Sequence, residues 1–136
     1  MGSEMCIRDR SSTYAVFSKL MLAKIESEQS NFENAEAYLS SILDNNLRDE
    51  FKHIVRLRLV RVLIANNKLE SAEKILENID ANQFISHYEE LRGDIFAKQG
   101  KIKKAEQAYH SALNDEINTG EARVILQMKL DDLEKI

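Results

Sequence analysis

The stretch RGDIFAKQGKIKKAEQAYHSAL, from Arg92 to Leu113, decides the fold of this chain. Its composition suits a helix, yet it contains Gly93 and Gly100, and a glycine inside a helix costs about 1 kcal/mol relative to alanine. Glycine fits where two backbones approach closely, or where a turn needs a positive φ. A helical hairpin contains both a close helix contact and such a turn. If the hairpin is a repeated unit, related segments should occur elsewhere in the chain.

Two other segments share its pattern. SNFENAEAYLSSIL from Ser30 and NKLESAEKILENI from Asn67 align with GKIKKAEQAYHSAL from Gly100. Each segment has a turn-tolerant first residue, an apolar residue two positions later and then an Ala-Glu pair. The paired alanines are Ala35, Ala72 and Ala105, so the spacings are 37 (72 − 35) and 33 (105 − 72) residues. These spacings are typical of helical-hairpin repeats.

Small or apolar residues recur at fixed distances from these alanines. Twelve residues earlier stand Ala23, Val60 and Gly93, and the apolar register after the alanines continues at Leu39, Leu76 and Tyr109, then at Ile42, Ile79 and Ala112. A small residue in the first helix lets the two helices of a hairpin approach closely. We therefore expect Gly93 at a close helix contact and Gly100 in a left-handed turn.

The chain as a whole reads as all-α. It contains no proline, where usage of about 5% would give roughly seven in this length, and β-hairpin patterns are missing. We predict helices at 13–29, 32–44, 49–66, 69–79, 84–99, 102–114 and 120–134. These helices form three hairpins followed by a C-terminal capping helix.

The first ten residues, MGSEMCIRDR, differ from the rest and resemble an expression-vector scar or a translated adapter read-through. We expect residues 1–10 to be an artefact outside the fold, and 11–136 to form a single domain of ordinary size. The composition is that of a foldable, soluble chain, with 43% apolar and 31% charged residues and a net charge of −4. The single cysteine, Cys6, lies in the excluded segment.

The third segment resembles a known repeat. Its residues Gly93, Phe96, Gly100, Ala105, Tyr109 and Ala112 follow the tetratricopeptide consensus of small, aromatic, glycine, alanine, aromatic and alanine residues. The resemblance implies a tetratricopeptide-like solenoid. The other segments depart from the consensus, with Val60 at a usually small position and Glu26 at a usually aromatic one.

A narrower resemblance covers 11–136. LRLVRVLIANNKLESAEKIL (Leu57 to Leu76), LRGDIFAKQGKIKKA (Leu91 to Ala105) and LQMKLDDL (Leu126 to Leu133) are similar to segments of the YfgM family, the ancillary subunit of the bacterial SecYEG translocon. The resemblance implies a periplasmic domain of a single-pass inner-membrane protein, near the translocon and the membrane-anchored chaperone PpiD. The chain lacks the membrane anchor of that family, which we expect to have been lost upstream.

The predicted binding surface follows from the tetratricopeptide resemblance, because the first helix of each hairpin lines a concave groove in such folds. By register we predict a protein-binding groove at Phe17, Lys24, Arg61, Ile64, Glu90, Asp94 and Lys98. Leu20 and Leu57 share this register, and a place in the core is the alternative for both. A mixed apolar and charged surface suits an extended peptide or a partner helix.

Enzyme chemistry has little support. His53, His87 and His110 lie far apart and form no HExxH or paired-cysteine pattern. No GxGxxG, P-loop or nucleophile-elbow pattern occurs. We therefore expect no catalytic, cofactor-binding or metal-binding residues. A metal-dependent enzyme that uses the histidines is the alternative from another class.

Two short patterns have plainer explanations than the functions they suggest. RGD at Arg92–Asp94 would need an exposed loop to act in adhesion, but it falls within a predicted helix. The arginines Arg56, Arg58 and Arg61 are distributed around a helix, with Arg61 on its inner face, in a chain of pI about 5.4. Attraction to phosphates is weak in such a chain, so we expect no nucleic-acid partner.

Together these observations predict a non-catalytic interaction scaffold. By the family resemblance, it would face the periplasm, associate with the SecYEG translocon and a PpiD-like chaperone, and help exported proteins. Two alternatives share the fold: a holdase chaperone that binds unfolded clients directly, and a tetratricopeptide adaptor of another complex. Self-association is also open, since concave faces and repeat ends offer docking surfaces.

Overall fold

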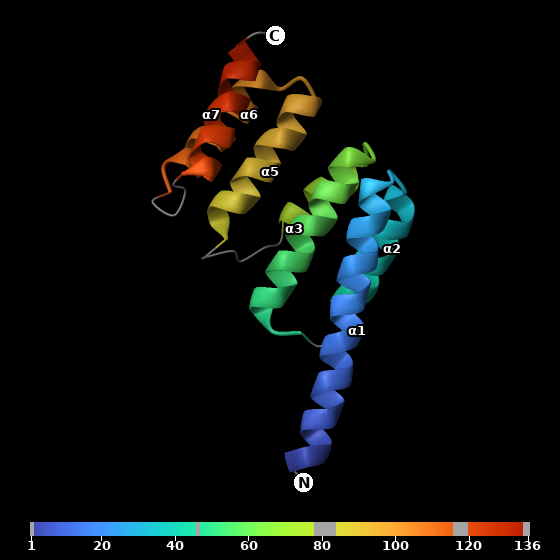
Figure 1. Cartoon of the computed structure of the whole chain (residues 1–136). Coiled ribbons are helices and arrows are strands. Elements are labelled where there is room, and N and C mark those ends of the chain that lie inside the picture. Colours follow the sequence, from blue (N-terminus) through green and yellow to red (C-terminus); the bar gives the residue numbers. More distant parts are fainter. Residues whose placement is uncertain (1, 46, 78–83, 116–119, 135–136) are drawn as a thin grey trace. The chain divides into compact units, whose positions relative to one another are not determined.

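The computed structural model describes residues 2–45, 47–77, 84–115 and 120–134, and these residues form seven α-helices with no strand among them (Figure 1). The helices are α1 (Gly2–Glu28), α2 (Phe32–Leu43), α3 (Asp49–Ala65), α4 (Leu69–Glu77), α5 (Ile85–Lys98), α6 (Ile102–Leu113) and α7 (Glu121–Glu134). The predicted all-α class is confirmed. Apart from the start of α1, and from the predicted end of the fourth helix at 79, which lies outside the described residues, each described helix end lies within two residues of its predicted position.

The start of α1 is where the sequence prediction was wrong. The helix begins at Gly2 rather than at residue 13. Residues 2–12 contain no proline, so nothing in the sequence forbids the helical hydrogen-bond pattern there. The assignment of residues 1–10 to an artefact, and of 11–136 to a single domain, stays a prediction.

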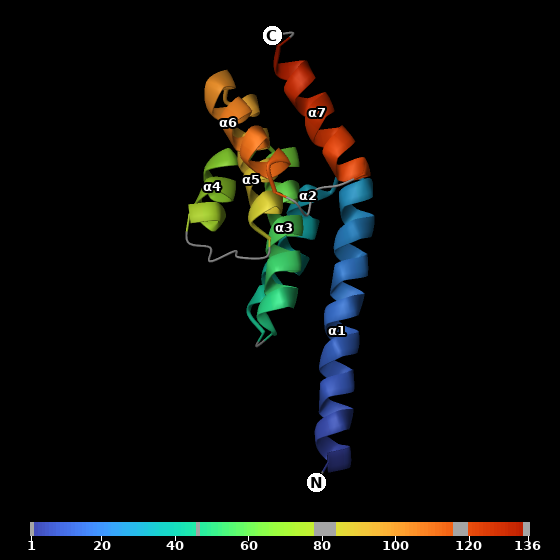
Figure 2. The same ribbon diagram turned by 90° about the vertical axis from the view of Figure 1, so that its left-hand side faces the viewer.

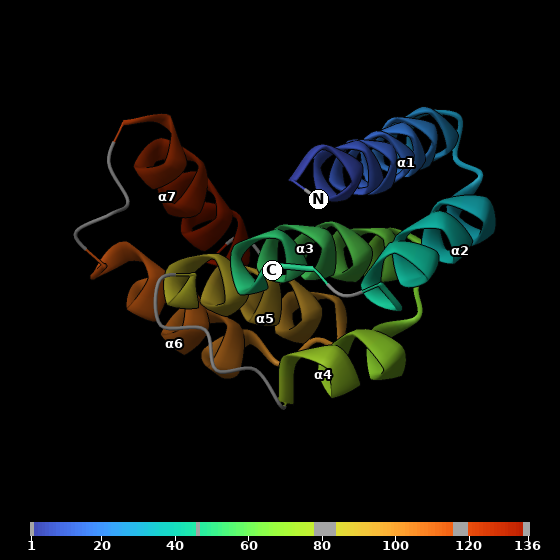
Figure 3. The same cartoon turned by 90° about the horizontal axis from the view of Figure 1, so that it is seen from below.

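The chain divides into two compact units, Met1–Asn66 and Asn67–Ile136. In unit 1, α1 and α2 form a hairpin, and α2 also packs against α3 (Figure 3). In unit 2, α5 and α6 form a hairpin, while α4 packs against α5 and α7 packs against α6 (Figure 2). The first and third predicted hairpins are therefore confirmed. The second has one helix in each unit, and its pairing stays a prediction.

The turns that follow α1, α3 and α5 each contain a residue with a left-handed backbone, as expected for Gly100. Gly100 has a φ of 78°, and Ser30 and Asn67 have φ values of 63° and 61°. The Gly100 amide donates to the Ala97 carbonyl at 3.1 Å, and the Lys101 amide donates to the Phe96 carbonyl at 2.9 Å. This pair of bonds satisfies carbonyls that the end of α5 would otherwise leave without partners.

The predicted apolar register is buried throughout the described residues. The buried members are Ala23, Ala35, Leu39, Ile42, Val60, Ala72, Leu76, Gly93, Ala105, Tyr109 and Ala112; Ile79 lies outside the described residues. A Cβ built on Gly93 would lie only 2.6 Å from Cε1 of Tyr109. The aromatic ring of α6 thus occupies the space that the missing side chain of α5 leaves free.

Candidate protein-binding surface

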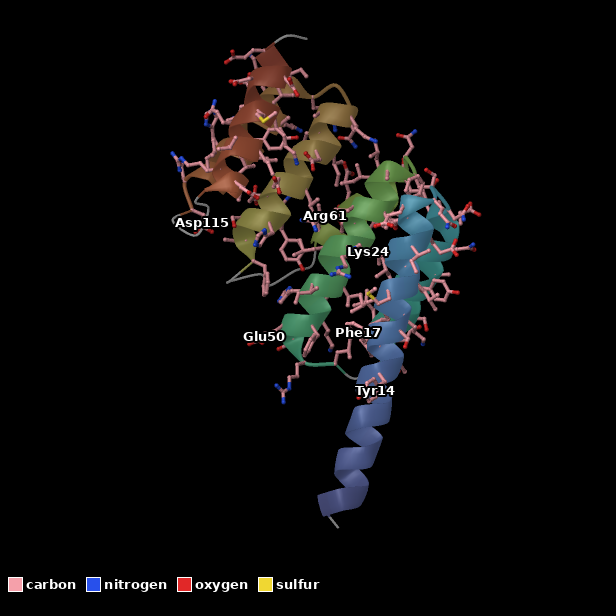
Figure 4. The ribbon with its side chains drawn as sticks, viewed as in Figure 1. Tyr14, Phe17, Lys24, Glu50, Arg61 and Asp115 are labelled. Carbon is pink, nitrogen blue, oxygen red and sulfur yellow. The ribbon has the colours of Figure 1, made fainter. Side chains whose placement is uncertain are left out.

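Unit 1 contains an open pocket of about 360 Å³ between α1, α2 and α3. Its floor is mostly apolar and is formed by Leu20, Ala23, Phe32, Leu39 and Val62. Lys24 of α1 and Arg58 and Arg61 of α3 also line it, and all three are exposed. We call this pocket, with its three basic side chains, the basic pocket. Figure 4 shows Lys24 and Arg61 on their two helices.

The basic side chains of this pocket are available to a ligand. Within the residues that the structure describes, no carboxylate forms an ion pair with Lys24, Arg58 or Arg61. By contrast, Lys19 donates from Nζ to Oγ of Ser41 at 2.7 Å, and so is bound to α2. The pocket therefore concentrates positive charge beside an apolar floor, although the chain carries a net charge of −4. Such a site favours an apolar segment that carries acidic residues.

An apolar stripe continues along α1 beside the basic pocket. Tyr14, Phe17, Met21 and Ile25 follow one another at steps of three and four residues, so they share one face of the helix. Their exposed fractions run from 44% for Met21 and Ile25 to 70% for Tyr14. Apolar side chains that gather on one exposed face mark an interaction site more often than isolated ones do.

Of the groove residues predicted on α1 and α3, the structure brings Lys24 and Arg61 together at the basic pocket. Phe17 is exposed on α1, on the apolar stripe (Figure 4). Ile64 is only 8% exposed, so little of its side chain can contact a ligand. Leu20 lines the pocket, whereas Leu57 is buried, in accord with the alternative reading for that leucine.

The groove residues predicted on α5 belong to unit 2, and two of them bind other helices of that unit. The Tyr109 hydroxyl of α6 donates to Oδ1 of Asp94 at 2.5 Å. Lys129 of α7 lies 3.0 Å from Oδ1 of Asp94 and 3.4 Å from Oε1 of Glu90. These contacts tie α5 to α6 and α7. Lys98 is exposed at the end of α5.

Burial raises the pKa of Tyr109 far above its ordinary value, and the hydrogen bond to Asp94 and the charges of Asp94 and Glu90 add to the effect. The folded state therefore keeps the phenol proton above pH 10, where the unfolded chain loses it. The contribution of Tyr109 to the free energy of unfolding has its full value below pH 10. Above pH 10 this contribution falls by up to about 1.4 kcal/mol per pH unit.

Urea unfolding of the wild type and of Tyr109→Phe between pH 8 and 11 measures this effect. The difference in free energy of unfolding between the wild type and Tyr109→Phe should fall above pH 10. A difference that stays constant across this range would contradict the raised pKa of Tyr109.

The sequence prediction missed Arg58. It was treated as one of three arginines distributed around a helix, with only Arg61 on the inner face. Arg58 and Arg61 are three residues apart, a spacing that places both on one face of α3, and both line the basic pocket. The spacing was the available signal.

The remaining sequence patterns have simple positions in the structure. RGD lies inside α5, where Arg92 donates to Glu89 at 2.8 Å and Gly93 contacts Tyr109. His53, His87 and His110 lie on α3, α5 and α6. In the described part of the chain, no group of three or more histidine, cysteine or acidic residues is placed to hold a metal ion. None of the described helices has the length and apolar character needed to span a bilayer.

Comparison with known proteins gives consistent matches. A family model described as a tetratricopeptide repeat-like domain matches residues 2–135. A relative from Buchnera aphidicola subsp. Schizaphis graminum, named ancillary SecYEG translocon subunit, is 30% identical over 132 residues, covering 97% of this chain and 68% of the relative. Proteins of the same name from Escherichia coli K12 and Neisseria gonorrhoeae are 24% and 31% identical over 132 and 114 residues. They are covered over 64% and 54% of their lengths, and this chain over 97% and 84%. No solved structure shows a significant match.

Proposed function

Because the chain belongs to the family of ancillary SecYEG translocon subunits and carries a tetratricopeptide repeat-like domain, we propose that it is a non-catalytic interaction module associated with the Sec translocon. The names of the relatives support this association. The family resemblance further suggests a domain facing the periplasm, tethered to the inner membrane outside the present sequence. We expect a PpiD-like chaperone to be the second partner, and we expect the module to help exported proteins.

The observation that carries the proposal is the basic pocket. Its apolar floor provides contact area, and Lys24, Arg58 and Arg61 supply charges for a partner with acidic residues. Of the predicted groove residues, Phe17, Lys24 and Arg61 are exposed in unit 1, and we keep these three as the core of the proposed site. Glu90 and Asp94 act chiefly by holding unit 2 together, through the contacts with Lys129 and Tyr109.

Binding to SecYEG in lipid nanodiscs, with and without a PpiD-like chaperone, tests this proposal. We expect saturable binding by the immobilised chain, and about tenfold weaker binding by Arg58→Glu/Arg61→Glu, because the pocket then repels acidic partners. The matched control is Lys74→Glu/Lys103→Glu, which makes the same charge change on exposed residues of α4 and α6.

The control variant should bind like the wild type. Absence of binding by the wild type to either partner overturns the proposed function. Equal loss in both double variants would instead mean that net charge, and not the basic pocket, governs binding.

The apolar stripe of α1 favours a second candidate function, that of a holdase. Tyr14, Phe17, Met21 and Ile25 would bind exposed apolar segments of unfolded clients without needing acidic residues. Suppression of client aggregation by the chain alone, insensitive to Arg58→Glu/Arg61→Glu, would favour this candidate over the scaffold.

A further inference from the structure

Helix α7 carries apolar residues on two faces. Leu126, Leu130 and Leu133 are buried in the core of unit 2. Val124, Ile125 and Met128 are 59%, 48% and 60% exposed. A helix that only closes a repeat array has a polar outer face. The exposed apolar residues of α7 are therefore not explained by its capping role.

The outer face of α7 is also acidic. Positions 121, 124, 125, 128, 131 and 132 follow the three-and-four spacing of one helix face, and Glu121, Asp131 and Asp132 are the exposed carboxylates among them. The two basic residues of α7 both bind groups on other helices of unit 2. Arg123 donates to the Leu113 carbonyl at 3.3 Å, and Lys129 pairs with Asp94 and Glu90. Gln127 donates to Oδ1 of Asp131 at 3.2 Å. Among the described residues, the outer face thus combines apolar side chains with carboxylates that form no ion pair.

The basic pocket of unit 1 has the complementary properties. Its floor is apolar, and the charges at Lys24, Arg58 and Arg61 have no acidic partner among the described residues. A pocket of about 360 Å³ is too small for a whole helix but can receive one or two side chains from a helix face. Met128 suits this role because an unbranched methionine adapts to irregular pockets.

We propose that the outer face of α7 docks on the basic pocket of a second copy of this chain. Ile125 and Met128 would enter the pocket, and Asp131 and Asp132 would face its arginines. This is the helix-in-groove mode of recognition, with specificity supplied by charge. The two surfaces differ, so the contact is head-to-tail: each copy offers one pocket and one helix. The inference goes beyond the proposed function, since it needs no translocon component.

A mixing experiment on the full chain tests this head-to-tail contact. Arg58→Glu/Arg61→Glu replaces the arginine charges of the basic pocket by negative charges. Asp131→Lys/Asp132→Lys replaces two negative charges on the outer face of α7 by positive ones. All four residues are exposed, so the fold should persist, which circular dichroism checks. We expect the wild type to self-associate with rising concentration in sedimentation velocity, and to dissociate as salt is added.

Each double variant alone should be monomeric. Mixed together, they should associate again, because the intact helix of the first fits the intact pocket of the second, and the reversed charges of the two altered surfaces also attract one another. Lys74→Glu/Lys103→Glu should associate like the wild type. A wild type that stays monomeric at every concentration overturns the inference, as does a mixture that stays monomeric. Neither result affects binding to SecYEG, so failure here is separate from failure of the proposed function.

Discussion

Replacement of Leu126 by alanine should lower the free energy of unfolding by about 2–5 kcal/mol, the range for deleting a large buried aliphatic side chain. Leu126 is 1% exposed, and lies in a cluster with Tyr109, Leu130 and Leu133. The loss combines the transfer energy of the deleted methyl groups with the cavity that remains, because the surrounding helices relax only in part. Urea unfolding of the full chain, followed by circular dichroism, measures the change.

Met128→Ala is the matched control for this cavity. It shortens an apolar side chain on the same helix, but Met128 is 60% exposed. Its effect on the free energy of unfolding should stay within about 0.5 kcal/mol. Equal effects of Leu126→Ala and Met128→Ala on the free energy of unfolding would mean that Leu126 is not buried against the other helices of unit 2. Met128→Ala should also weaken self-association, which separates the role of the outer face from that of the core.

Gly93→Ala should destabilise the chain by about 1–3 kcal/mol, although glycine to alanine inside a helix ordinarily stabilises it by about 1 kcal/mol. The new Cβ would lie 2.6 Å from Cε1 and 2.7 Å from Cδ1 of Tyr109. That ring cannot easily move, because it is buried and its hydroxyl is bonded to Asp94. Thermal and urea unfolding of the single variant measure the cost.

A double-mutant cycle identifies the cause of the Gly93 effect. In a Tyr109→Ala background the obstacle is gone, so Gly93→Ala should recover the usual helix gain relative to Tyr109→Ala alone. If Gly93→Ala costs the same in both backgrounds, contact with Tyr109 is not the reason for glycine at this position.

Local features of this fold were accessible from the sequence. The ends of the helices follow from where turn residues interrupt an otherwise helical composition. Ser30, Asn67 and Gly100 were expected at turns, and Gly100 in a left-handed one. Such features depend on φ preferences and on hydrogen bonds between residues close in the chain. The start of α1 was missed because residues 1–10 were set aside as an artefact, although no proline interrupts a helix there.

The sequence predicted only part of the candidate binding surface. Repeat register placed Lys24 and Arg61 on one predicted groove, because register follows from helix periodicity, and both line the basic pocket. It could not tell that Glu90 and Asp94 would pair with Lys129, which lies 35 residues beyond Asp94 in the chain. It also left Arg58 outside the site, since the exposure of an arginine depends on which neighbours cover it.

In the described residues, the sequence by itself determined the helices after residue 13, the turns at Ser30, Asn67 and Gly100, and the repeat register that buries Ala35, Ala72 and Ala105. Each of these depends on hydrogen bonds, periodicity and turn chemistry among residues close together in the chain, where the local signals agree. Only the tertiary structure decided which charges remain available. Lys24 and Arg58 meet at one pocket because α1 and α3 both pack against α2. The basic residues of α7 bind inward instead, and leave an acidic and apolar outer face. Charge pairing depends on distances between side chains from different helices, which no pattern along the chain encodes.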